Sequence, residues 1–161
     1  MDRWEYLVTK EYKLRHYISK YFLDDVDAII DVGAYKTRID WDNVIAIDPL
    51  MTMDDSYHGT VSQWVKEPFY FKIENCGVMA LGLEIEGDEN EWNTFIALME
   101  ECKTAIIEFS KDHQPSVQQA QYILDNTSKE IKMEIDIAFP EVETAGFKPH
   151  ANRKLIILKR K

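Results

Sequence analysis

The 161-residue sequence lacks any long run of uncharged apolar residues. A helix that crosses a membrane needs about 18 to 20 such residues in succession. The N-terminal stretch MDRWEYLVTKEYK also mixes acidic and basic side chains too densely for the apolar segment of a secretory signal. We therefore expect a cytoplasmic protein without a membrane-spanning segment.

Cysteine and histidine are scarce, with two and four residues respectively. Cys76 and Cys102 lie in apolar segments and form neither a CxxC pair nor a spacing typical of metal ligands. His16, His58 and His150 show no metal-binding spacing either. The sequence thus predicts buried free thiols, no structural disulfide and no metal site.

Basic residues are few as well, because 19 Lys and Arg stand against 29 Asp and Glu, a formal net charge of −10. Sequence-independent binding of nucleic acid needs clustered cations that contact the phosphate backbone. The C-terminal segment RKLIILKRK has five basic residues, but an apolar run with charged ends is typical of a strand that finishes a sheet. Nucleic acid is therefore a disfavoured partner, and the substrate is expected to be a small molecule or a protein.

Segments of helical and extended pattern alternate along the chain. Residues 1–24 have the periodicity of an amphipathic N-terminal helix, and residues 26–161 are expected to form an α/β core within the same single domain. Seven apolar segments are predicted as strands: VDAIIDVG, NVIAID, FYFKI, CGVMALGLEI, TAIIEFS, KMEIDIAF and RKLIILKRK. Two longer segments between them, NEWNTFIALMEECK and PSVQQAQYILDNTS, are predicted as helices, the first capped by Asp88 or Asn90.

This alternation predicts a three-layer α/β sandwich with a mostly parallel sheet of about seven strands. We expect no helix between the last two strands, so they should pair antiparallel. Ligands of such sheets bind beyond the carboxyl ends of the strands. Residues 31–37, 48–51 and 84–88 should therefore share one rim of the sheet.

Two strands that reach this rim end in aspartate, Asp31 in AIIDVG and Asp48 in VIAID. The interval between them is 17 residues, whereas a full crossover helix makes it about 20 or more. We expect residues 35–43 to contain at most one helical turn, because nine residues must also turn twice to bring the second strand beside the first.

The order of these motifs resembles the S-adenosylmethionine-dependent methyltransferases of the Rossmann-like class I. It consists of DVGA, a short connection, IDP, then GVMALGLEI before an amphipathic helix, and a terminal antiparallel strand pair. The resemblance covers roughly residues 29–161. It implies a Rossmann-like fold, S-adenosylmethionine as cofactor and transfer of its methyl group to an acceptor that the sequence does not identify.

In that family the loop after the first strand carries a glycine-rich pattern that begins with an acidic residue and passes close to the cofactor. Asp31 and Gly33 match this pattern, and Ala34 completes the small pair GA. Tyr35 and Thr37 stand where further glycines are expected, so the chain would be a degenerate or shortened variant.

The family's second strand ends in a carboxylate that accepts hydrogen bonds from the cofactor ribose. Asp48 matches that position and Pro49 follows it. Glu84 lies after the strand CGVMALGLEI, in the segment that lines the pocket in the family. The acidic run that begins there is equally consistent with a solvated loop and helix start.

Two residues after the strand TAIIEFS are candidates for contact with substrate. His113 could exchange a proton near neutral pH. Lys111, with Glu84 across the rim, resembles the lysine and acidic residues of ribose-directed RNA methyltransferases. Both residues could equally be ordinary loop residues.

Three hypotheses remain open from the sequence. The first is a small methyltransferase with a shortened first connection. The second is a methyltransferase-like fold without catalysis, a binding or regulatory module, which the missing glycines favour. The third is another nucleotide-binding α/β protein such as an oxidoreductase, against which the absence of GxGxxG and the terminal strand pair argue.

Overall fold

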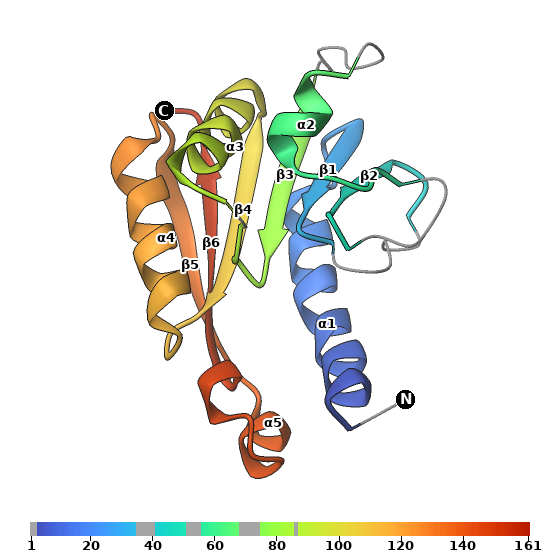
Figure 1. The fold of residues 1–161 in the computed structure, drawn as a ribbon, viewed down its shortest axis with the longest axis vertical. Coiled ribbons are helices and arrows are strands. Elements are labelled where there is room, and N and C mark those ends of the chain that lie inside the picture. Colours follow the sequence, from blue (N-terminus) through green and yellow to red (C-terminus); the bar gives the residue numbers. More distant parts are fainter. Residues whose placement is uncertain (1–2, 35–40, 51–55, 68–74, 86) are drawn as a thin grey trace.

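The computed structural model describes residues 3–34, 41–50, 56–67, 75–85 and 87–161. In chain order its elements are α1 (Arg3–Phe22), β1 (Ala28–Val32), β2 (Val44–Ile47), α2 (Val61–Val65), β3 (Cys76–Leu81), α3 (Glu89–Glu101), β4 (Thr104–Ser110), α4 (Gln114–Asn126), β5 (Glu130–Ala138), α5 (Pro140–Thr144), the 3₁₀-helix η1 (Lys148–His150) and β6 (Asn152–Lys159). Figure 1 shows the strands side by side with helices packed along them. Among the described residues, no helix is long and apolar enough to span a membrane.

The described strands form one sheet in the order β2-β1-β3-β4-β6-β5. Neighbours from β2 to β4 pair in parallel, whereas β6 pairs antiparallel with both β4 and β5. The mostly parallel sheet with a terminal antiparallel pair confirms the predicted fold class. Six strands are described, and the seventh expected strand, FYFKI at residues 69–73, lies outside the described residues.

Each face of the sheet contributes to its own apolar cluster. On one face α2, α3 and α4 pack on strand residues such as Ile30, Val78 and Ile107. On the other face the end of α1 packs on residues such as Ile29, Met79 and Ile106. Neighbouring strand residues alternate between the two clusters, because successive side chains of a strand point to opposite faces. This is the three-layer arrangement predicted for apolar strands covered on both sides.

The expectation that no helix lies between the last two strands is wrong. α5 and η1 occupy that connection, although β5 and β6 still pair antiparallel as predicted. Proline stands in the first turn of both short elements, where its fixed φ favours helix and its missing N–H costs nothing. A helix of five residues is too short to show a helical period in the sequence.

The two cysteines confirm the prediction of buried free thiols. Cys76 begins β3 and Cys102 follows α3, and their sulfur atoms are 3.1 Å apart. That separation is longer than the roughly 2.05 Å of a disulfide bond. The pair lies at the amino ends of β3 and β4, opposite the rim on which ligands of parallel sheets bind.

At Gly77 in β3 the segment that follows α1 packs closely against the sheet. A Cβ added at Gly77 would lie 2.5 Å from Leu23 Cδ2 and 3.4 Å from Val26 Cγ2. Leu23 is 2 % exposed, so its side chain has little room to move aside. Glycine here leaves room for Leu23 and Val26, which follow α1, to pack against β3.

We expect the substitution Gly77→Ala to lower the free energy of unfolding by about 1–3 kcal/mol, because it overpacks a closed site. Urea unfolding followed by circular dichroism measures this change. The double variant Gly77→Ala with Leu23→Ala should lose less than the sum of the two single losses, because the second change removes the clashing methyl group. Additive losses would contradict the proposed contact.

Candidate functional site

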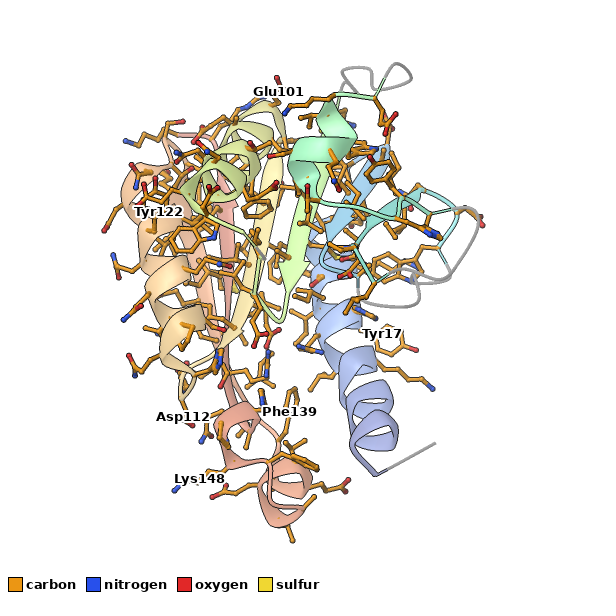
Figure 2. All side chains as sticks on the ribbon, in the orientation of Figure 1. Tyr17, Glu101, Asp112, Tyr122, Phe139 and Lys148 are labelled. Atoms are coloured by element: carbon orange, nitrogen blue, oxygen red, sulfur yellow. The ribbon has the colours of Figure 1, made fainter. Side chains whose placement is uncertain are left out.

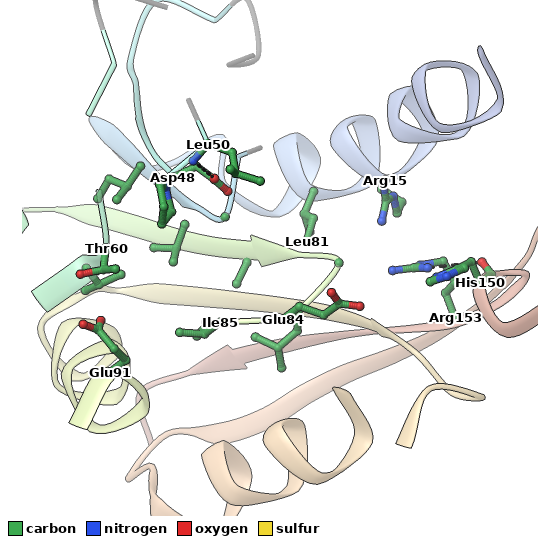
Figure 3. Close-up of a pocket in the computed structure, with 18 of the residues that line it drawn as sticks. Arg15, Asp48, Leu50, Thr60, Leu81, Glu84, Ile85, Glu91, His150 and Arg153 are labelled. Carbon is green, nitrogen blue, oxygen red and sulfur yellow. Dashed lines mark hydrogen bonds between the residues drawn. The ribbon is translucent and has the colours of Figure 1, made fainter. Parts of the chain in front are cut away.

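A cleft of about 370 Å³ lies at the carboxyl ends of β1, β2 and β3. Its walls come from the turns after these strands, from the start of α2, from Glu91 in α3, and from residues of α1, α5, η1 and β6. Figure 3 shows that Asp48, Thr60 and Glu91 lie toward one end and that Arg15, His150 and Arg153 lie toward the other. The cleft thus has an acidic end and a basic end, at the rim predicted from the sequence.

Gly33 forms the turn after β1 and lines the cleft. Its φ of 76° is in the left-handed region that favours glycine. Its N–H donates to the carbonyl of Ile47 over 2.9 Å, and the N–H of Ala34 donates to the same oxygen over 3.3 Å. A Cβ at Gly33 would meet nothing within 4 Å, so the backbone conformation, rather than crowding by the protein, requires glycine here.

Asp48 follows β2 and its carboxylate lies at the acidic end of the cleft (Figure 3). Its Oδ1 accepts a hydrogen bond of 2.7 Å from the N–H of Leu50. The backbone around it is also held, because Asp48 N–H donates to Tyr57 O and Gly59 N–H donates to Asp48 O, each over 3.1 Å. These bonds fix the carboxylate at the acidic end of the cleft.

Thr60 and Glu91 continue the acidic end beyond Asp48. Thr60 caps α2 through its side-chain oxygen, which accepts from Gln63 N–H over 3.2 Å. Glu91 Oε2 accepts from the N–H of Ser62 over 3.2 Å, which ties α3 to the start of α2. This end therefore presents hydrogen-bond acceptors on elements that are tied to one another.

Asp31 does not line the cleft, although it belongs to the same motif as Gly33. It is 5 % exposed. Burial, and to a smaller extent the negative charge of Asp48, raise the pKa of its carboxyl group to about 7, although Arg15 acts in the opposite direction. Ala34 also lies outside the cleft lining, whereas Gly33, Asp48, Pro49 and Glu84 are brought together there.

The raised pKa of Asp31 predicts a pH dependence of stability. The unfolded carboxyl group has a pKa near the ordinary value of 3.8 and the folded one a pKa of about 7, so between these values the folded state binds more protons. Stability from this residue is therefore greatest below the lower value and decreases as pH rises toward 7. We expect Asp31→Asn to remove this decrease, measured as unfolding free energy from pH 4 to pH 8 for both proteins; parallel profiles would contradict it.

The predicted substrate residues have different neighbours from those expected. Glu84 lines the cleft, and its Oε1 lies 3.5 Å from His113 Nδ1, which is also 2.7 Å from Ser116 Oγ. Lys111 instead forms an ion pair with Asp136 over 3.2 Å. Neither Lys111 nor His113 lines the cleft. A contact between either residue and substrate stays a prediction.

The basic end contains a buried ion cluster that the sequence analysis missed. Glu108 in β4 has no exposed side-chain surface; it accepts hydrogen bonds from Arg15 Nη1 over 2.6 Å, from Gly82 N–H over 2.7 Å, and from Arg153 Nε. Burial alone would raise the pKa of Glu108, but the two guanidinium groups and these hydrogen bonds hold it below its usual value. The available signal was one glutamate inside the strand TAIIEFS, since a charge among buried residues needs a partner.

Comparison with known proteins supports the fold and not a family. No family model and no curated protein matches the sequence. The crystal structure of magnesium protoporphyrin IX methyltransferase from Synechocystis PCC 6803 with bound S-adenosylmethionine is similar, with a TM-score of 0.53 and 11% identity over 97% of this chain and 80% of that one. A protein of the NADB-Rossmann superfamily from Streptococcus agalactiae gives a TM-score of 0.45 and 12% identity over 84% of this chain and 63% of that one.

At these identities the likeness is one of fold. The described sheet, with its parallel strands and terminal antiparallel pair, defines the chain as a Rossmann-like α/β protein. This fold is shared with a structure of a methyltransferase that was crystallised with S-adenosylmethionine.

Proposed function

We propose that the cleft binds S-adenosylmethionine and that the protein is a methyltransferase. The observation that carries this proposal is that Gly33 and Asp48, which follow the neighbouring strands β1 and β2, line the same cleft. A left-handed turn with open space above it adjoins a carboxylate that the Leu50 N–H holds in place. A carboxylate can accept two hydrogen bonds from the two hydroxyl groups of a ribose, and an open turn lets a ligand approach the backbone.

The residues of the cleft fit an adenosine-type cofactor. Asp48 would hold the ribose, and Gly33 would form the floor beneath it. The walls at Leu81, Leu83 and Ile85 are apolar. When bound, S-adenosylmethionine supplies an activated methyl group, so the protein has mainly to position the acceptor against it.

Titration with known cofactors tests this proposal. We expect S-adenosylmethionine and S-adenosylhomocysteine to raise the melting temperature of the purified protein, because each binds the folded state alone. NAD⁺ should not raise it, since no GxGxxG turn is present to receive its pyrophosphate. An absence of calorimetric binding by S-adenosylhomocysteine at millimolar concentration would contradict the proposal, and a response to NAD⁺ alone would favour the oxidoreductase hypothesis.

A non-catalytic binding module is the second candidate. The sequence feature that favours it is the pair Tyr35 and Thr37, which replaces glycines of the family's cofactor loop. Both functions predict binding of S-adenosylhomocysteine. Slow conversion of S-adenosylmethionine to S-adenosylhomocysteine in the presence of candidate acceptors would distinguish the enzyme from the module.

A further inference from the structure

The basic end of the cleft differs from the rest of the protein in charge. The whole chain has a formal net charge of −10. Yet the side chains of Arg15 and Arg153, which are 5% and 9% exposed, both line this end of the cleft. Figure 3 shows them converging with His150 from three different elements.

Glu108, which does not itself line the cleft, contacts both guanidinium groups. Arg153 contacts it through Nε and, over 3.4 Å, through Nη2, while Arg153 Nη1 donates to the carbonyl of His150 over 3.3 Å. Arg15 Nη1 contacts the other side of the same carboxylate over 2.6 Å. The two planar cations are therefore fixed before any ligand arrives, and a fixed guanidinium loses little entropy when it binds an anion.

We propose that this basic end is a subsite for a carboxylate, which is carried either by the amino-acid part of the cofactor or by the methyl acceptor. The proposal rests on the proposed function, because it assumes that adenosine occupies the acidic end. Arg15 and Arg153 bind the carboxylate oxygens, and guanidinium groups match the planar shape of a carboxylate.

Two further carboxyl groups among the described residues, those of Glu84 and Asp31, also act on the basic end of the cleft. Glu84 points toward this end in Figure 3, but its side chain is 60% exposed, so water screens its charge. Asp31 acts on Arg15 from within the sheet and does not line the cleft.

Apolar side chains border the same subsite. Phe139, directly before α5 (Figure 2), and Val142 within α5 line the cleft together with Leu81. Phe139 and Val142 are buried, with exposed fractions of 4% and 3%. A carboxylate attached to an apolar body would therefore bind better than a free inorganic anion.

The test uses the full chain and the variant Arg15→Met. Methionine keeps the helix-forming tendency and much of the length of arginine, and Glu108 keeps its contacts with Arg153 and Gly82. Arg15→Lys retains the charge and should partly restore binding. Lys103→Met is the matched control, because it removes one cation, paired with Asp25 over 2.8 Å, at the amino end of β4.

Two pairs of probes distinguish the sources of the carboxylate by calorimetry. The first pair is S-adenosylhomocysteine and methylthioadenosine, which lacks the amino-acid part. The second is phenylacetate and its neutral amide, phenylacetamide, added to protein saturated with S-adenosylhomocysteine. The preference is the ratio of the affinities of the two probes in a pair. In Arg15→Met the loss of a charged hydrogen bond should reduce this ratio by about tenfold in one pair. In Lys103→Met the ratio should stay unchanged.

A reduced preference in the first pair assigns the subsite to the cofactor, and one in the second pair assigns it to the acceptor. The proposal is overturned if the wild type prefers the carboxylate in neither pair, or if Arg15→Met keeps every preference. If neither adenosine compound binds the wild type, the proposed function fails. Phenylacetate and phenylacetamide, titrated into the free protein and the variant, then decide the carboxylate subsite alone.

Discussion

Replacement of Glu108 by alanine is expected to lower the free energy of unfolding by about 3–5 kcal/mol, because it leaves buried cations without their shared carboxylate. Arg15, Arg153 and the N–H of Gly82 all donate to this one side chain. Urea unfolding of the purified variant measures the loss. A change no larger than that of a surface residue would show that the cluster contributes little.

Two controls separate the charge of Glu108 from its shape. Glu130→Ala removes another strand glutamate that pairs with a lysine, Lys132, but at the surface of β5; we expect no measurable change there, since exposed ion pairs contribute little. Glu108→Gln keeps an acceptor oxygen for Gly82 while it removes the charge. The free energy of unfolding of Glu108→Gln should lie between those of the wild type and Glu108→Ala.

Much of the fold could be predicted because it follows from local pattern. β-branched runs such as AIIDV and TAIIEFS form buried strands, and Asp88 caps α3 with a 3.0 Å bond to Asn90 N–H, as its position before the helical period predicts. The parallel order then follows from helices between strands. α5 was missed because its short span carries no detectable period.

The candidate site could be predicted only where its residues belong to one motif. Gly33 and Asp48 end adjacent strands, so strand order alone brings them together. The basic end joins Arg15 to Glu108 across 93 residues of sequence, and no local pattern encodes that contact. Likewise, Lys111 follows β4 as expected, yet its partner is Asp136 of β5, a strand that is two positions away in the sheet because β6 pairs antiparallel with both β4 and β5.

Asp48 is the residue whose replacement should change ligand binding most within the acidic end of the cleft. We expect Asp48→Ala to weaken S-adenosylhomocysteine at least tenfold, since hydrogen bonds to a charged group contribute about 1.5–3 kcal/mol. The fold should persist, because the hydrogen bonds that join Asp48 to Tyr57 and Gly59 are made by backbone atoms. Calorimetric titration gives the affinities, and circular dichroism verifies the fold.

Asp48→Asn tells whether the lost affinity comes from the charge or from the turn. Asparagine can still accept the N–H of Leu50 that Asp48 accepts over 2.7 Å, so the loop should keep its shape while the carboxylate is lost. An affinity between those of wild type and Asp48→Ala is therefore expected. The same variant should lower the pKa of Asp31, which the charge of Asp48 helps to raise, and so shift the pH dependence of unfolding toward acid. Equal affinities in all three proteins would show that the ribose does not bind at Asp48, even if the cleft binds the cofactor elsewhere.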